Sequence, residues 1–298
     1  MNYNGTITCR SNNIFITKSF TMNQHLLLPI IAWPLLTVTC VTIILLGLNS
    51  TLKRTGWGHR KQKNVLVTTA IFIIVWMVAL LLLSDAGFFS DFSSLPPRPL
   101  FAMLFPLPFV VYFAFSKTGR RILHLAPPQW LILIQSFRIP VEILLWVAFL
   151  NKQLPANMTF EGRNFDVWSG ILALVTAYLL IRRVFNRSLV VAIYNGVGLL
   201  LLLNILIIAV LSMPTSFRYF MDEPSNTIVG SIPYILLPGV LVPIAYSFHI
   251  FSLRQLFIRR KEKPAPPRDV NSFLRTAAKR VADEKSKFGA AQSAPGLS

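Results

Sequence analysis

Residues 65–83 read VLVTTAIFIIVWMVALLLL and contain no charged side chain. A helix of roughly 20 residues, rising ~1.5 Å per residue, crosses a bilayer core about 30 Å thick. The rest of the chain has the same character, because 54% of its 298 residues are hydrophobic, 13% are charged and the mean hydropathy is +0.58. Soluble domains carry about a quarter charged residues. The sequence therefore predicts an integral membrane protein.

Seven apolar runs of comparable kind divide the chain, and polar or Pro/Gly-rich sequence bounds each of them. They lack the alternation of apolar and polar residues that marks a transmembrane β-strand, and a helix satisfies its own backbone hydrogen bonds in lipid. The predicted fold is an all-α, polytopic transmembrane helix bundle of about seven spans. The runs cover residues 26–48, 65–83, 100–115, 130–150, 167–181, 189–211 and 232–251.

Basic residues concentrate in alternate connections, which predicts the orientation of the chain. The connections after the first, third and fifth runs are basic and contain no acid, whereas the other connections hold most of the acids. The positive-inside rule then places the N-terminus outside and the C-terminus in the cytoplasm. The basic residues of these three connections are Lys53, Arg54, Arg60, Lys61, Lys63, Lys117, Arg120, Arg121, Arg182, Arg183 and Arg187.

Three regions follow from this pattern: a polar segment 1–25, a seven-helix transmembrane domain 26–251 and a basic tail 252–298. Met22 is an alternative start of the chain. Within the tail, apolar residues recur at helical spacing over 269–282, which fits an amphipathic helix on anionic inner-leaflet lipids; a helix that frays in water is the alternative. The net charge of +18 is thereby explained by topology and lipid contact, without a nucleic-acid partner.

The fourth run carries charges at mid-membrane depth. Arg138 and Glu142 are four residues apart, so they share a helix face and can pair, and Gln135 lies one turn earlier. A charge at that depth costs at least ~2.5–3.5 kcal/mol on insertion scales. Either this face lines a cavity for a polar ligand, or the pair is structural and holds helices together. Pro140 between the charges frees a backbone carbonyl and favours a kink.

Further candidates lie in the connection 151–166 and in the sixth run. Asn164 and Asp166 belong to a stretch rich in aromatic and charged residues, which could form an outer lip above the Arg138 and Glu142 face. A plain helix N-cap is the alternative role for Asp166. Asn195 is a polar residue within a span, where asparagine commonly links helices and contributes ~1 kcal/mol or less.

The pattern Gln135-x-Phe137-Arg138-x-x-Val141-Glu142, followed by residues 161–166, resembles a group of uncharacterised bacterial multi-pass membrane proteins. The resemblance implies a bacterial inner membrane, which is a plasma membrane, and implies no activity.

Several functional classes find no support in the sequence. The last run has no lysine for a retinal Schiff base, and no zinc-protease, phosphate-loop or dinucleotide-binding motif is present. The two cysteines and four histidines show no metal-ligand spacing, so no cofactor is expected, and an enzymatic function is not favoured. We therefore expect a protein that binds or transports a small polar ligand through Gln135, Arg138, Glu142, Asn164, Asp166 and Asn195. A membrane scaffold or sensor component with a structural ion pair is the alternative.

Overall fold

The computed structural model describes residues 5–11, 14–20, 24–183 and 186–261. The predicted amphipathic helix 269–282 and most of the predicted tail lie outside these residues, as does the alternative start at Met22.

The N-terminal segment forms a β-hairpin, in which β1 (Gly5–Ser11) pairs antiparallel with β2 (Ile14–Phe20). The sequence analysis assigned no structure to this segment; its threonines and isoleucines favour extended strands.

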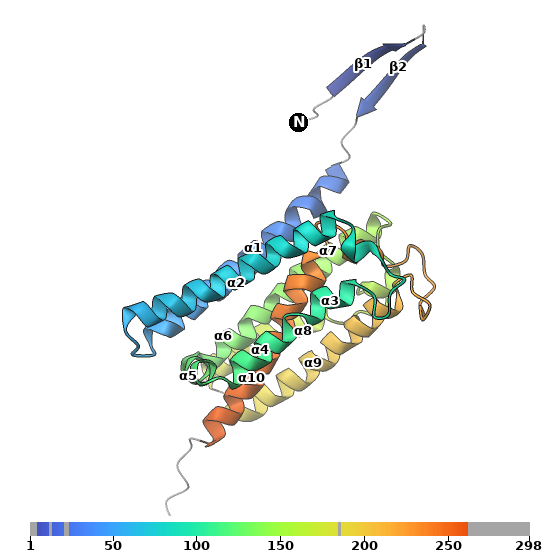
Figure 1. Ribbon diagram of the computed structural model, residues 1–298. Helices are drawn as coiled ribbons and strands as arrows, with labels where there is room; N and C mark the ends of the chain where they lie inside the picture. Colours follow the sequence, from blue (N-terminus) through green and yellow to red (C-terminus); the bar gives the residue numbers. More distant parts are fainter. Residues whose placement is uncertain (1–4, 12–13, 21–23, 184–185, 262–298) are drawn as a thin grey trace, which may run out of the picture. The chain divides into compact units, whose positions relative to one another are not determined.

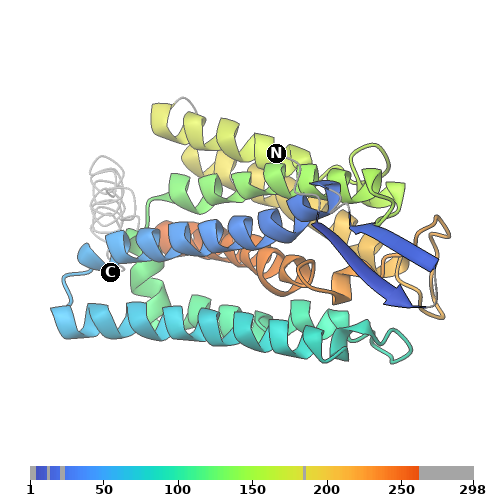
Figure 2. The same cartoon turned by 90° about the horizontal axis from the view of Figure 1, so that it is seen from above.

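The first two predicted spans form a helical hairpin. α1 (Gln24–Lys53) and α2 (His59–Asp85) pack together, and both views show them side by side (Figures 1 and 2). Only 6% of the apolar stretch of α2 is buried inside the protein. Nearly all of its apolar surface is therefore left for lipid tails, as the uninterrupted run 65–83 predicts.

The third predicted span is broken by proline. α3 (Pro99–Leu104) and α4 (Leu107–Phe115) are separated at Pro106, which has no backbone N–H to continue the helix. α5 (Lys117–Leu125) then leaves the direction of the preceding segment by 76°. The Ser116 hydroxyl caps α5 by accepting a hydrogen bond from the Gly119 N–H at 2.9 Å. The sequence analysis treated this basic segment as a plain connection.

The fourth span is one helical run with a change of pitch. α6 (Pro128–Leu133) passes through the 3₁₀ turn η2 (Ile134–Phe137) into α7 (Arg138–Leu150). Pro140 lies in the first turn of α7, where a missing N–H is tolerated. The change of pitch falls directly before Arg138, and α6 to α7 counts as a single span, Pro128–Leu150.

The next two spans pack around this run. α8 (Val167–Arg182) contacts α6, α7 and α9 (Arg187–Leu211), as Figure 1 shows. α8 is only 16 residues long, which matches the short predicted run 167–181. Its small buried residues allow the neighbouring helices to approach closely: they are Ser169, Gly170, Ala173, Thr176 and Ala177.

The last span differs from its prediction at its start. The helix begins with a π-helical turn, η5 (Leu237–Leu241), and continues as α10 (Val242–Lys261). The predicted run began at residue 232, but Pro233 and Pro238 interrupt regular helical bonding there. Pro243, four residues after Gly239, has no N–H to offer the Gly239 carbonyl, and this carbonyl accepts a hydrogen bond from the Trp76 indole N–H at 2.8 Å. This bond ties η5 to α2.

The number of spans roughly fits the prediction of seven. Within the described residues, five helices are long and apolar enough to cross a membrane, and a sixth span results if the bent segment from α3 to α5 counts as one. α8 is the remaining apolar helix and is shorter. The all-α, membrane-type architecture is therefore confirmed outside the N-terminal hairpin.

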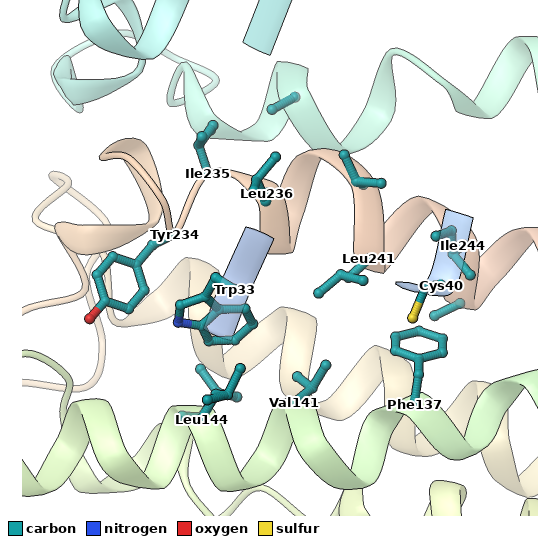
Figure 3. Close-up of a cluster of buried hydrophobic side chains, with 14 of the residues drawn as sticks. Trp33, Cys40, Phe137, Val141, Leu144, Tyr234, Ile235, Leu236, Leu241 and Ile244 are labelled. Carbon is teal, nitrogen blue, oxygen red and sulfur yellow. The ribbon is translucent and has the colours of Figure 1, made fainter. Parts of the chain in front are cut away.

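The core lies between α1, α7 and the start of the last span. Trp33 is completely buried, and Figure 3 shows its indole between Leu144 of α7 and Leu236. The Tyr234 ring meets Trp33 edge to face, with the centroids 5.9 Å apart. This packing fixes the position of α7, which carries the charged residues.

Several basic connections meet at one end of the helices. Arg121 of α5 donates to the Thr55 carbonyl in the connection between α1 and α2 at 3.2 Å. Gln255 near the end of α10 donates to the Leu123 and Ala126 carbonyls at 2.5 and 2.7 Å. The segments that the sequence analysis assigned to one side of the membrane are therefore neighbours.

Candidate functional site

Three ionisable side chains lie buried along α7 and at the start of α8. Arg138, Glu142 and Asp166 are 2%, 1% and 5% exposed. Charged residues are almost never so fully buried unless they are paired. The contacts that each of these three side chains makes therefore indicate the role of this part of the protein.

Arg138 connects three helices through one nitrogen atom. Its Nη1 atom lies 3.1 Å from Asp166 Oδ1, donates a hydrogen bond to the Ser169 hydroxyl and reaches the Gly198 carbonyl at 3.4 Å. The sequence analysis expected Arg138 to pair with Glu142, and this was wrong. The tight packing of α8 on α7 brings Asp166 to the guanidinium instead, although Glu142 is nearer in sequence.

Asp166 precedes α8 but does not cap it. Its side chain accepts no capping hydrogen bond, because the carboxylate faces Arg138. The Asp166 backbone N–H donates to Asn164 Oδ1 at 2.9 Å. The plain N-cap interpretation is therefore wrong, and the connection 151–166 contacts Arg138 through Asp166.

Glu142 has an amide, not a cation, as its partner. Asn164 Nδ2 lies 2.7 Å from both carboxylate oxygens and donates a further bond to the Met158 carbonyl at 3.0 Å. Within the described part of the chain, Glu142 takes part in no ion pair. Asn164 is fully buried, so it holds the connection 151–166 against α7.

A second polar group lies between α9 and α10. Asn195 Nδ2 donates to the Val191 carbonyl and the Ser252 hydroxyl, both at 2.8 Å, and Asn195 Oδ1 lies 2.9 Å from His249 Nδ1. The Tyr194 ring stacks on His249 with a centroid distance of 5.7 Å. The sequence analysis named Asn195 as a candidate but gave His249 no role. The spacing of His249, Ser252 and Gln255 along one helix face is the signal that could have found this cluster.

Gln135 contributes to helix packing. Its Nε2 atom donates to the Ala245 carbonyl of α10 at 2.9 Å, which joins η2 to α10. Its Oε1 atom has no hydrogen-bond partner among the described residues.

A cavity of about 70 Å³ lies beside the charged residues. Its walls come from α3, α7, α9, η5 and α10, and most of them are apolar, with Leu202, Leu206 and Leu241 among the wall residues. Arg138, Glu142 and Asp166 form its ionisable wall, while Gln135, Asn164 and Asn195 do not line it. We call this cavity, with its three ionisable residues, the chamber.

Several buried polar atoms at these sites lack a partner within the described chain. Arg138 Nε and Nη2 donate to nothing, and His249 Nε2 is also without a hydrogen bond. Such buried orphans are rare in folded proteins and commonly mark a bound water, ion or ligand. No group of three or more His, Cys, Asp and Glu side chains that could hold a metal occurs in the described residues.

Long apolar helices and a buried ionisable cluster define this chain as an integral membrane protein of the polytopic helical class. Residues 99–257 match the family described as "Domain of unknown function (DUF8737)", and the chain belongs to this family. The match runs from α3 into α10 and includes every residue of the chamber. No curated protein and no solved structure matches the chain. The expectation of an uncharacterised family is thus confirmed in that form.

Proposed function

We propose that the protein binds a small polar ligand in the chamber, or transports it through the membrane by way of the chamber. One observation carries the proposal: a cavity borders three buried ionisable side chains at once. Ionisable residues inside transmembrane segments are costly and commonly mark a ligand or ion pathway. A sealed structural seam would need no cavity at this place.

The free donors of Arg138 suggest how a ligand is oriented. Arg138 Nη1 is occupied by Asp166, Ser169 and Gly198, while Nε and Nη2 have no partner among the described residues. An acceptor oxygen of a ligand or of a bound water satisfies these donors without competing with Asp166. Glu142, on the same helix face, provides an acceptor for the other end of the ligand.

Ligand-dependent stabilisation of the purified protein tests this proposal. Thermal unfolding in nanodiscs is measured with a panel of small amines, carboxylates and alcohols, because a ligand that binds only the folded state raises the unfolding temperature. We expect at least one class to stabilise the wild type and to lose its effect in Ala209→Phe, which fills the chamber. The control Leu200→Phe lies on the same helix at a position that is 69% exposed. Equal behaviour of both variants would contradict the proposal.

A scaffold or sensor component remains the second candidate, because Arg138 joins α7, α8 and α9 through a single atom. In that case the ion pair of Arg138 and Asp166 serves only to hold the helices together. The exchanged variant Arg138→Asp with Asp166→Arg would then retain stability, and no compound of the panel would affect either protein. A stable exchanged variant that has lost ligand stabilisation would favour the chamber instead.

For localisation we propose a bacterial inner membrane with the N-terminus outside and the basic tail on anionic lipids of the inner leaflet. Support comes from the basic connections that meet at one end of the helices. Single-cysteine variants Ser93→Cys and Lys63→Cys, with Cys9 and Cys40 replaced, test the orientation. A membrane-impermeant maleimide should label Ser93→Cys in intact cells and Lys63→Cys only after lysis; the reverse order would refute it.

A further inference from the structure

The charges around the chamber do not balance. Arg138 is the one cation in its wall, and Asp166 lies 3.1 Å from it. Glu142 is the remaining ionisable group, and both its oxygens share the single Asn164 Nδ2 donor at 2.7 Å. The described chamber wall therefore holds two carboxylates and one guanidinium.

A neutral amide does not compensate a full charge in an apolar surrounding. Taking an ionised carboxylate out of water costs several kcal/mol even after relaxation of the protein, and apart from Arg138, Glu142 and Asp166 the residues that line the chamber are apolar. Glu142 therefore carries a proton when the chamber is empty, or it pairs with a cation that comes from outside the chain.

The neighbouring elements supply no such cation. The chamber wall, as far as the structure describes it, contains no lysine and no second arginine. The titratable groups in the middle part of the elements around Glu142 are Arg138 on α7, Asp166 before α8, Cys40 on α1, Tyr194 on α9, and Tyr246 and His249 on α10. The described cations elsewhere on these elements, among them Lys53, Arg182, Arg187 and Arg254, do not line the chamber. His249 already directs Nδ1 at Asn195, and the charge of Arg138 is matched by Asp166.

We propose that the ligand of the chamber carries an ammonium-type cation that pairs with Glu142 and displaces the proton held there. This inference rests on the proposed function and names its ligand class. The exchange is balanced: the Glu142 O–H bond breaks, the proton leaves to solvent, and the carboxylate pairs with the incoming cation. Because Asp166 matches Arg138, no uncompensated positive charge repels that cation.

The size of the chamber limits the ligand. A water needs at least about 10–15 Å³ of such volume, so about 70 Å³ holds only a few heavy atoms. A short alkyl chain fits the apolar walls, and its ammonium group fits Glu142. Propylammonium is therefore a suitable probe, with 1-propanol as the neutral analogue and propionate as the anionic one.

Calorimetric titration of the full chain in neutral-lipid nanodiscs tests the inference. Titrations in two buffers with different ionisation enthalpies report how many protons leave on binding. We expect propylammonium to bind more tightly than 1-propanol or propionate, to release up to about one proton per cation, and to bind more tightly as pH rises. Glu142→Gln should weaken its binding at least ~10-fold and remove the proton release, whereas Glu161→Gln, an exposed carboxyl bonded to Trp146, should change neither.

The outcomes separate the two proposals. Binding of propionate or 1-propanol in preference to propylammonium would overturn the cation inference and leave a ligand-binding chamber. Propylammonium binding that survives Glu142→Gln, or that releases no proton at any pH, would also overturn it. If none of the three probes binds the wild type, both the inference and the proposed function fail.

Discussion

Nη1 of Arg138 lies 3.1 Å from Oδ1 of Asp166, across the boundary between α7 and α8. The pair is buried, with side-chain exposures of 2% and 7%, and the Ser169 hydroxyl shares the same Arg138 nitrogen. Because Asp166 belongs to the connection 151–166 and Arg138 to a membrane helix, the pair fixes where that connection meets the helices. It also leaves Glu142 without a positive partner.

Removal of one member of this pair should be strongly destabilising. Arg138→Ala leaves Asp166 as an uncompensated buried charge, which costs about 3–5 kcal/mol in buried pairs. The free energy of unfolding in detergent or nanodiscs measures this loss. The matched control is Arg98→Ala, which breaks the Arg98–Asp91 pair at 2.8 Å with exposures of 36% and 32%. Exposed pairs contribute ~0–1 kcal/mol, so equal losses in the two variants would contradict the assigned roles.

The contact between Asn164 and Glu142 should be required for the connection 151–166 to pack against α7. Asn164→Leu removes the amide that bonds Glu142 and Met158, and an unsatisfied buried acceptor costs about 1–3 kcal/mol. The double variant Asn164→Leu with Glu142→Leu should recover part of this loss, since it removes both polar partners. A double-mutant cycle of unfolding free energies measures the coupling, and purely additive losses would show that the two side chains do not interact.

The two glycines of α9 should respond differently to alanine. A Cβ at Gly198 would lie 2.5 Å from His249 Cε1 and 3.3 Å from Ser169 Oγ, whereas a Cβ at Gly196 meets nothing within 4 Å. Gly198→Ala should therefore destabilise by about 1–3 kcal/mol through overpacking. Gly196→Ala should be neutral or stabilise by up to about 1 kcal/mol, because alanine favours a helix over glycine. The unfolding temperatures of both variants test this prediction, and equal shifts of the unfolding temperature would argue against close packing at Gly198.

Asp91, in the connection between α2 and α3, should titrate below a free aspartate. The Ser93 hydroxyl and backbone N–H donate to it at 2.6 and 3.0 Å, and with Arg98 they lower the pKa of Asp91. Because the pKa of Asp91 is lower in the folded state, the ionised carboxylate stabilises the fold. This stabilisation is present above the unfolded pKa of ~3.9 and is lost as pH falls through the folded pKa.

The Ser93 bonds lower this pKa more than Arg98 does, because solvent screens the exposed ion pair. Carbon-13 NMR of the Asp91 carboxyl follows its titration. Ser93→Ala should raise the midpoint more than Arg98→Ala does, and the opposite order would refute the assignment.

The sequence predicts the spans well because a membrane helix must be apolar along its whole length. The uninterrupted run of α2 and the short run of α8 were both recognisable for this reason. α5 escaped prediction, since it has only one buried face, formed by Gly119, Ile122 and Leu123. Its apolar residues are too few to stand out against its basic ones.

The candidate site was predictable in its members but not in its pairing. Arg138, Glu142 and Asp166 stand out as charges in or beside apolar runs. Which carboxylate pairs with Arg138 depends on how closely α8 approaches α7, and this approach is set by Ser169 and Gly170. Tertiary packing of that kind leaves no local sequence pattern. The partner of His249, Asn195 on α9, depends on the same kind of packing, although the polar spacing around His249 on α10 was visible in the sequence.

His249 should be held in one neutral tautomer by Asn195. The Asn195 amide nitrogen donates to the Val191 carbonyl and the Ser252 hydroxyl, so its oxygen faces His249 Nδ1 at 2.9 Å. An oxygen can only accept, so Nδ1 carries the proton and Nε2 is an open acceptor beside Gly198. Nitrogen-15 NMR of labelled histidine should show the Nδ1–H form for His249, with His249→Gln identifying its signal.

Asn195→Leu should release this restraint and cost about 1–3 kcal/mol, because it leaves buried polar groups unpaired. His59 is exposed, so its nitrogen signals should be unchanged in that variant and serve as the internal reference. A predominant Nε2–H form of His249 in the wild type would mean that the Asn195 amide is turned the other way. Nδ1 would then accept a hydrogen bond from the Asn195 amide, and His249 would present an N–H toward Gly198 in place of an open acceptor.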